Sequence, residues 1–231
     1  MLDTLSSDTE TSFLTQQFPS DSISPLVLEV GVGSGVVLAF VAANANTIFG
    51  RTDVAFLGTD VNPLAAKAAS QTVFNAIQDS NSQKSPPALL SIPVSDLTTA
   101  VRDGAVDVLI FNPPYVPTET LPLPPDSAAP EAQGSQAIFE RDSKLLELSY
   151  AGGAHGMETT DRLLDSLAST LSDRGVAYVL LCAQNKPEEV KARIRRWPGD
   201  WRVETVGWSG KKAGWEKLVI IRIWRDNTVA Q

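Results

Sequence analysis

Asp107-Val-Leu-Ile-Phe-Asn-Pro-Pro-Tyr115 joins a buried strand to a stiff polar turn. Its apolar run of β-branched and aromatic residues predicts a strand that ends at Asn112. The two prolines fix the backbone, remove two N–H donors and hold the residues before them extended. What remains is a rigid acceptor edge, made of the Asn112 side-chain oxygen and the carbonyls of Asn112 and Pro113, with the flat ring of Tyr115 beside it. Such an edge suits a planar donor such as an amide or an exocyclic amine.

Length and composition predict one intracellular α/β domain. The chain has 231 residues, of which 43% are hydrophobic and 20% are charged, as in globular domains with a substantial core. We therefore expect a single domain over 1–231. No run approaches the roughly 20 apolar residues that a membrane-spanning helix needs, and residues 1–10 lack the features of a secretory signal. The expected location is cytoplasmic, with a nuclear location also open.

The charge and the single cysteine exclude some classes of partner and site. A formal net charge of −8 disfavours a partner held by phosphate neutralisation, so nucleic acid is not expected to bind. The basic stretch 191–196 is typical of the solvated face of a helix with Ile194 turned inward. Cys182, the only cysteine, lies in an apolar strand and predicts a small core residue. The sequence therefore predicts no internal disulfide and no cysteine-based metal site, and we expect no bound metal.

A glycine-rich turn follows the first predicted strand. The strand 26–30 runs into Gly31-Val-Gly33-Ser-Gly35, and an apolar helix is expected over 36–45. Glycines let the backbone turn tightly and let an anionic or polar ligand approach the helix N-terminus. The spacing differs from the dinucleotide fingerprint and lacks the lysine of a phosphate-binding loop. Alone, this turn indicates either a nucleotide-type site or a tight structural turn.

Two acids follow the next two predicted strands. Asp60 ends the strand 54–60, about 25 residues beyond the glycine turn, where a carboxylate can accept from both ribose hydroxyls. It could also cap the helix expected over 64–77. Asp96 lies just past the strand 88–92, where it could accept from an adenine amine or simply form a turn. At this stage both alternatives stay open for each acid.

The remainder of the chain predicts further α/β units and a closing hairpin. Residues 1–10 are expected to fray, and 116–137, rich in proline, is expected to form a lid over the substrate. His155, the only histidine, lies in a second glycine-rich loop and is more typical of an incidental loop residue than of a general base. The elements expected are helices over 11–18, 139–150, 159–171 and 187–197, a strand over 175–182, and an antiparallel pair over 201–206 and 216–224.

Several motifs together resemble one family. Glu29-Val-Gly-Val-Gly-Ser-Gly35, Gly58-Thr-Asp-Val-Asn62 and Phe111-Asn-Pro-Pro-Tyr115 resemble the class I S-adenosylmethionine-dependent methyltransferases. More narrowly, the chain is similar to the eukaryotic and archaeal HemK-like glutamine methyltransferases that modify the Gly-Gly-Gln loop of the class I peptide-release factor. Three further stretches carry this likeness: Thr11-Ser-Phe-Leu14, Ala151-Gly-Gly-Ala-His-Gly156 and Lys211-Lys-Ala-Gly-Trp-Glu216.

The resemblance implies a fold and a set of site residues. The implied fold is a Rossmann-like, seven-stranded, mostly parallel sheet with the last strand antiparallel and helices on both faces. The implied catalytic residues are Asn112, Pro113 and Tyr115, and Pro114 joins them in holding the target amide. The residues implied to bind S-adenosylmethionine are Ser12, Glu29, Gly31, Gly33, Gly35, Asp60, Val61, Asp96 and Asn112, with the glycines beside the methionine moiety.

The resemblance also implies partners and an activity. The implied activity is N5-methylation of the glutamine side chain in the release factor. The implied partner is a small zinc-binding activator subunit that forms a heterodimer with the chain, and the exposed edge of the third strand is the expected place for it to add a strand.

Three other functions remain as alternatives. The same acceptor edge could hold adenine in nucleic acid or a histone-type lysine, although the acidic charge argues against DNA. A non-catalytic cofactor-binding scaffold would have no use for the acceptor edge. A nucleotide oxidoreductase is disfavoured by the spacing of the glycines.

Overall fold

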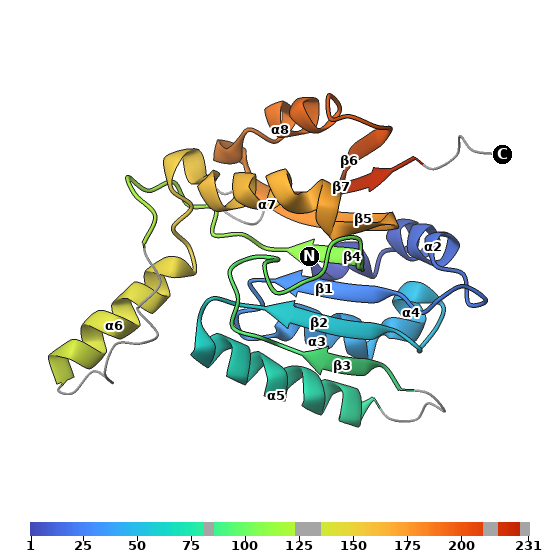
Figure 1. The fold of residues 1–231 in the computed structure, drawn as a ribbon, viewed down its shortest axis with the longest axis horizontal. Coiled ribbons are helices and arrows are strands. Elements are labelled where there is room, and N and C mark those ends of the chain that lie inside the picture. Colours follow the sequence, from blue (N-terminus) through green and yellow to red (C-terminus); the bar gives the residue numbers. More distant parts are fainter. Residues whose placement is uncertain (81–85, 123–134, 210–216, 227–231) are drawn as a thin grey trace.

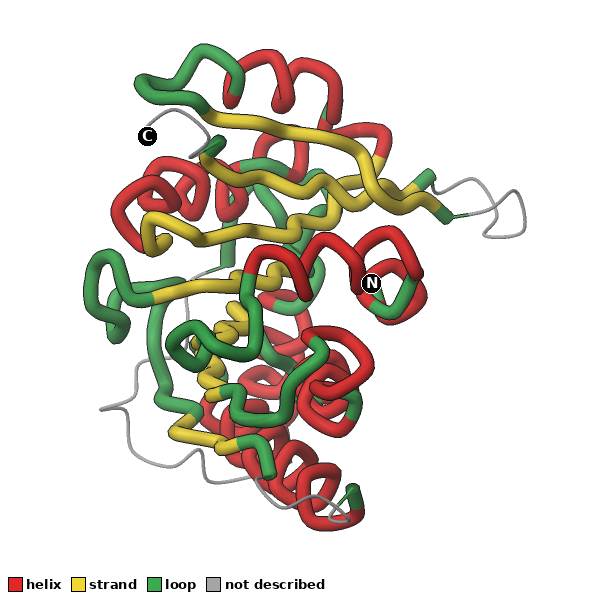
Figure 2. Tube along the Cα trace, turned by 90° about the vertical axis from the view of Figure 1, so that its right-hand side faces the viewer, coloured by secondary structure: helices red, strands yellow, loops and turns green. Residues whose placement is uncertain are grey.

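The computed structural model describes residues 1–80, 86–122, 135–209 and 217–226, which form a seven-stranded sheet with helices on both faces (Figures 1 and 2). The strand order is β3-β2-β1-β4-β5-β7-β6. β7 pairs antiparallel with both β5 and β6, and the other pairs are parallel. The strands are β1 (Leu26–Val30), β2 (Ala55–Thr59), β3 (Ala88–Ser91), β4 (Val106–Phe111), β5 (Leu171–Cys182), β6 (Trp201–Trp208) and β7 (Leu218–Arg225). This confirms the expected architecture and the closing antiparallel pair.

The strand that leads to the acceptor edge lies in the middle of the sheet. All six residues of β4 are buried, and the strand pairs with β1 on one side and β5 on the other. Alternate side chains serve two hydrophobic clusters: Val108 and Ile110 belong to one, and Leu109 and Phe111 to the other. Because helices cover both faces, a central strand carries apolar residues on both of its sides, which explains the hydrophobic run 108–111. The buried Asp107 that precedes this run pairs with Arg174 at 2.9 Å.

The two clusters divide the helices between the faces of the sheet. The cluster of Ile110 includes residues of the N-terminal helices, such as Leu14, Leu38 and Val73. The cluster of Leu109 includes residues of the later helices, such as Leu163 and Val190. The helices are α1 (Leu2–Leu5), α2 (Asp8–Gln17), α3 (Val36–Ala43), α4 (Ala45–Phe49), α5 (Pro63–Asp79), α6 (Ser135–Leu148), α7 (Glu158–Thr170) and α8 (Pro187–Ile194), with short 3-10 turns η1 (Ala154–Gly156) and η2 (Ala183–Asn185).

The expectation that residues 1–10 fray is wrong. They form α1 and the start of α2, and Leu5 and Glu10 are both buried. The Glu10 carboxylate accepts from the Tyr178 hydroxyl at 2.7 Å and from Arg222 at 2.9 Å. The acidic, Ser/Thr-rich composition suggested fraying, but pairing with a cation from β7 lets this carboxylate be buried and holds the helix on the sheet.

Several element boundaries differ from those expected. The helix expected over 36–45 is two helices, because the chain leaves the helical conformation at Asn44, whose side chain donates to the Phe40 carbonyl at 2.8 Å. β5 begins four residues early, at Leu171. The predicted lid lies largely outside the described residues, since only 116–122 of it is described before α6 begins at Ser135. In Figure 1 α6 extends away from the sheet.

None of the described helices combines the length and apolar character needed to cross a membrane.

Candidate active site

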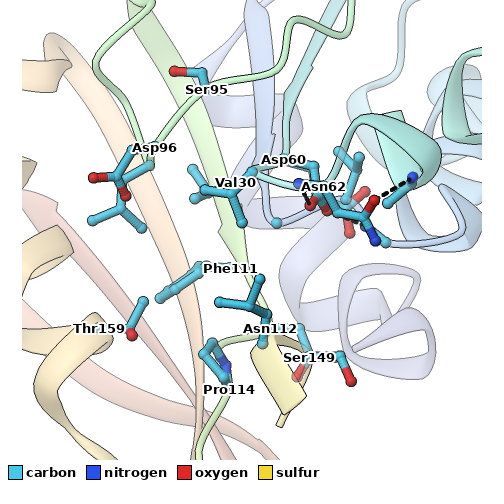
Figure 3. Close-up of a pocket in the computed structure, with 18 of the residues that line it drawn as sticks. Val30, Asp60, Asn62, Ser95, Asp96, Phe111, Asn112, Pro114, Ser149 and Thr159 are labelled. Carbon is cyan, nitrogen blue, oxygen red and sulfur yellow. Dashed lines mark hydrogen bonds between the residues drawn. The ribbon is translucent and has the colours of Figure 1, made fainter. Parts of the chain in front are cut away.

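A cavity of about 680 Å³ lies at the carboxyl ends of the parallel strands (Figure 3). It is lined by the last residues of β1 and β4, by residues that follow β1, β2, β3 and β4, and by residues of α3, α5, α6 and α7. In Figure 3, Asp60 and Asp96 lie on opposite sides of Val30, and Asn112 and Pro114 lie below them. Ligands in open α/β sheets bind at this edge, where the order of connections reverses.

The three glycines of the turn serve two different purposes. Gly31 and Gly33 line the cavity with φ values of +64° and +53°, a conformation that L side chains rarely adopt. Gly35 has φ +80°, and a Cβ there would lie 2.7 Å from the Cα of Ala69. Gly35 therefore lets α3 and α5 pack closely. It does not line the cavity, so its predicted contact with the cofactor is not shown by this arrangement.

Glu29 is a buried acid in the wall of the cavity. It is 3% exposed, and its Oε2 accepts from the Leu38 N–H at 2.8 Å in the first turn of α3. Burial raises the pKa of this carboxyl from 4.5 to about 8, the bond from Leu38 lowers it part of the way, and the nearby charge of Asp60 raises it. The site thus holds a carboxyl that a bound cation would ionise.

Asp60 holds the glycine turn against the end of β2. Its Oδ2 accepts from the Gly33 N–H at 2.9 Å and its Oδ1 from the Asn62 N–H at 2.8 Å. The cap of α5 is Asn62, whose Oδ1 accepts from Leu64 N–H at 2.9 Å, so the helix-capping alternative for Asp60 is wrong. Each carboxylate oxygen has a further lone pair for a ligand donor. Val61 lines the cavity beside it.

Asp96 lies at the opposite wall and is paired with Arg162 of α7. Both side chains are about half exposed, and both line the cavity. Sequence reasoning missed Arg162, since nothing in the sequence marked one arginine of an amphipathic helix as facing a site. The pair fixes one oxygen of the carboxylate and leaves the other available as an acceptor.

The acceptor edge opens into the same cavity. Asn112 is exposed and lines it together with Pro114. Pro113 is buried, and Tyr115 packs against the hydrophobic cluster of Ile110, and neither residue lines the cavity. The structure therefore brings Asn112 into one cavity with the glycine turn and the two acids. Ser12 is exposed on α2 and does not line the cavity.

Other residues of the site were not predicted. Ser149 and Thr159 line the cavity near Asn112 and Phe111, and Leu145 and Leu148 of α6 add an apolar wall. The only sequence signal for them was their position beside the second glycine-rich loop. His155 is exposed and does not line the cavity. Over the described residues no three His, Cys, Asp or Glu side chains gather as metal ligands would.

The chain is similar to known methyltransferases in its sequence. The model of the methyltransferase small domain matches residues 4–121. The eRF1 methyltransferase catalytic subunit mtq2 of Schizosaccharomyces pombe is 31% identical over 208 residues, covering 88% of this chain and 78% of that protein. The methyltransferase HEMK2 of Mus musculus is 32% identical over 85% of this chain and 76% of its own length.

An archaeal protein and one solved structure are also similar to the chain. A putative protein N5-glutamine methyltransferase of Methanocaldococcus jannaschii is 28% identical over 86% of this chain and 81% of its own length. The structure of a putative class I S-adenosylmethionine-dependent methyltransferase of Listeria monocytogenes is 16% identical with a TM-score of 0.47, covering 99% of this chain and 61% of that one. Through the matched domain and these relatives, the chain belongs to the methyltransferase small domain family.

Proposed function

We propose that this protein transfers a methyl group from S-adenosylmethionine to the side-chain nitrogen of the glutamine in the Gly-Gly-Gln loop of a class I peptide-release factor. The observation that carries the proposal is the continuity of one cavity from the glycine turn to Asn112. A cofactor at the turn and a planar amide at the acceptor edge would share this space. Relatives named as an eRF1 methyltransferase and as a release factor glutamine methyltransferase support the choice of acceptor.

The residues present fit S-adenosylmethionine. Asp60 offers acceptors for a ribose diol, and Asp96 offers one for an adenine amine at the opposite wall. Glu29 supplies a carboxyl whose ionisation a cationic ligand would favour. When bound, the cofactor supplies an electrophilic methyl group on a sulfonium sulfur.

The chain contributes orientation rather than strong acid–base chemistry. An amide nitrogen is a poor nucleophile because its lone pair is delocalised into the carbonyl. Asn112 and the Pro113 carbonyl accept from its two N–H bonds and aim the nitrogen, and positioning of this kind can remove roughly 7–11 kcal/mol of barrier. These acceptors bind more strongly as positive charge develops on the nitrogen, so they favour the transition state. The product nitrogen is then a strong acid and loses its proton without a dedicated base.

Methyl transfer to a purified release factor tests this proposal. Labelled S-adenosylmethionine is supplied with the Gly-Gly-Gln release factor or its Gly-Gly-Ala variant. We expect label only in the Gly-Gly-Gln protein, and we expect N112A to keep cofactor affinity while losing transfer. Transfer to an oligonucleotide or a histone tail in place of the release factor would move the function to adenine or lysine. Wild-type turnover by N112A would refute the mechanism.

We also propose that the small zinc-binding activator subunit adds a strand to β3. β3 is an edge strand that pairs with β2 alone among the described strands, and three of its four residues are exposed. Leu90 on this strand, Phe74 on α5 and Val94 beyond the strand are apolar side chains that are all more than half exposed. An apolar edge strand is a template for a partner strand. We also propose that the protein is located in the cytoplasm, where release factors act.

A further inference from the structure

Asn185 lies outside the cavity, and its side chain is buried and extensively hydrogen-bonded. It ends the 3-10 turn η2 after β5 and is 2% exposed. Its Nδ2 donates to the carbonyls of Tyr115 at 3.3 Å, His155 at 3.0 Å and Gly156 at 3.2 Å. Its Oδ1 accepts from the Cys182 N–H at 2.7 Å. One side chain therefore ties together the end of β5, the turn after β4 and the second glycine-rich loop.

The acceptor edge depends on such contacts because prolines supply no N–H donors. β4 pairs with its neighbours as far as Phe111. Pro113 and Pro114 then have no N–H with which to bond the backbone to anything else. Downstream, the Val116 N–H donates to the Tyr150 carbonyl at 2.9 Å. The direction of the edge is thus set by the strand on one side and by the contacts of residues 115–116 on the other.

The second glycine-rich loop, residues 151–156, packs directly against this downstream end. A Cβ on Gly152 would overlap the Pro114 carbonyl, and a Cβ on Gly156 would overlap the Tyr115 carbonyl. Gly156 also has φ +69°. The Gly152 N–H donates to the Val116 carbonyl at 2.8 Å. Glycines let the loop approach this closely, and Asn185 bonds to carbonyls on both sides of the contact.

We propose that Asn185 is a positioning residue for methyl transfer. By fixing the Tyr115 carbonyl against the loop, it sets the direction in which Asn112 and the Pro113 carbonyl present their acceptors. It touches neither the acceptor nitrogen nor the cofactor. This inference rests on one part of the proposed function, namely that Asn112 holds the reacting nitrogen.

Two substitutions at this position separate hydrogen bonding from packing. N185A removes all four bonds. N185D keeps the volume and the acceptor for Cys182 N–H but turns a charged oxygen towards three carbonyls in place of a donor. We expect kcat to fall about 10- to 100-fold in both, as for a misplacement on the order of 1 Å, with cofactor affinity within twofold of wild type. We also expect the N185D activity, relative to wild type, to recover as pH falls, because a protonated carboxyl regains one donor.

A matched pair of glycine variants tests the same contact from the other side. G156A places a methyl group against the Tyr115 carbonyl at φ +69°, whereas G104A has nearly the same φ of +67° and no atom within 4 Å of the new Cβ. Both carry similar backbone strain, and only G156A pushes on the acceptor edge. We expect G156A to lose turnover and G104A to keep it. Amide exchange at Val116 and Gly152 should speed up in N185A, N185D and G156A but not in G104A.

The outcomes separate this inference from the proposed function. If the wild-type protein methylates adenine or lysine in place of glutamine, the proposed function fails, and the same variants are compared on that acceptor. If N185D and G156A keep wild-type kcat, Asn185 does not position the edge. If turnover falls only in proportion to the folded fraction or to cofactor affinity, its role is structural and the inference is overturned.

Discussion

Glu29 makes the stability of this protein fall with rising pH in a predictable window. Its carboxyl has a pKa of about 8 in the folded protein against 4.5 when exposed, with burial the main cause. Between these values the folded state binds more protons than the unfolded state, so the free energy of unfolding decreases as pH rises. The rise in the pKa of Glu29 from 4.5 to about 8 corresponds to a stabilisation of the folded protein by about 5 kcal/mol, at 1.36 kcal/mol per pKa unit. This stabilisation is fully lost above pH 8.

The variant E29Q isolates this contribution. Glutamine keeps an acceptor for the Leu38 N–H and removes the ionisable group. We expect E29Q and wild type to have similar stability near pH 5, and E29Q to be more stable by up to about 5 kcal/mol at pH 9. Urea unfolding at intervals of half a pH unit measures the difference. Because every other titrating group is common to both proteins, a difference that stays constant from pH 5 to 9 would refute the reasoning.

The same carboxyl links cofactor binding to proton release. A cationic ligand favours the ionised form, so binding near pH 7 should release up to one proton from Glu29 and should tighten as pH rises towards 8. Calorimetry in buffers of different ionisation enthalpy counts that proton. We expect E29Q to bind S-adenosylmethionine more weakly and to release none. Equal proton release by the two proteins would mean that the cofactor leaves Glu29 protonated.

Three further changes have expected outcomes. G35A should lower the free energy of unfolding by roughly 2–5 kcal/mol, since the new Cβ would meet Ala69 at 2.7 Å with φ +80°, and denaturant unfolding measures this. R162A should free Asp96 and thereby raise the dissociation constant of S-adenosylmethionine roughly two- to fivefold. The stability should change little because the ion pair is half exposed. An unchanged dissociation constant would contradict this prediction. L90D should change the free energy of unfolding by no more than about 0.5 kcal/mol, because Leu90 is exposed. It should weaken binding of the activator subunit at least about tenfold. Unaltered co-purification would exclude the β3 edge as the binding site of that subunit.

The sequence could predict which strand ends meet at the cavity because this part of the fold is built from local units. In parallel sheets each strand delivers its carboxyl end to the same edge, so the residues that follow β1, β2 and β3 had to meet. Gly33 and Asp60 are joined by a hydrogen bond across two consecutive units. The placement of Asn112 at the end of a central strand followed from the apolar run 108–111, since a central strand is buried on both faces.

The features that sequence reasoning missed depend on partners far apart in the chain. Glu10 appeared to belong to a fraying tail, but its partner Arg222 lies 212 residues away. Gly35 fitted a ligand-binding pattern, but its lack of a side chain serves the approach of Ala69 on another helix. A local sequence pattern predicts strands, helices and turns. Which contacts a residue such as Glu10 or Gly35 makes depends on the packing of elements that are distant in the sequence.

The two halves of the site therefore depend on different kinds of constraint, and their variants should behave differently. The half around Glu29 and Asp60 is held by bonds within and between neighbouring βα units, so changes there act mainly on cofactor affinity. The acceptor edge has no donors in its prolines and is held from outside, by the second glycine-rich loop and by Asn185. Under the proposed function the target nitrogen is held at this edge, so small shifts of that support would move it without emptying the cofactor site. Changes around Asn185 should consequently lower kcat while cofactor affinity stays near wild type, and this division is what a reaction driven by orientation requires.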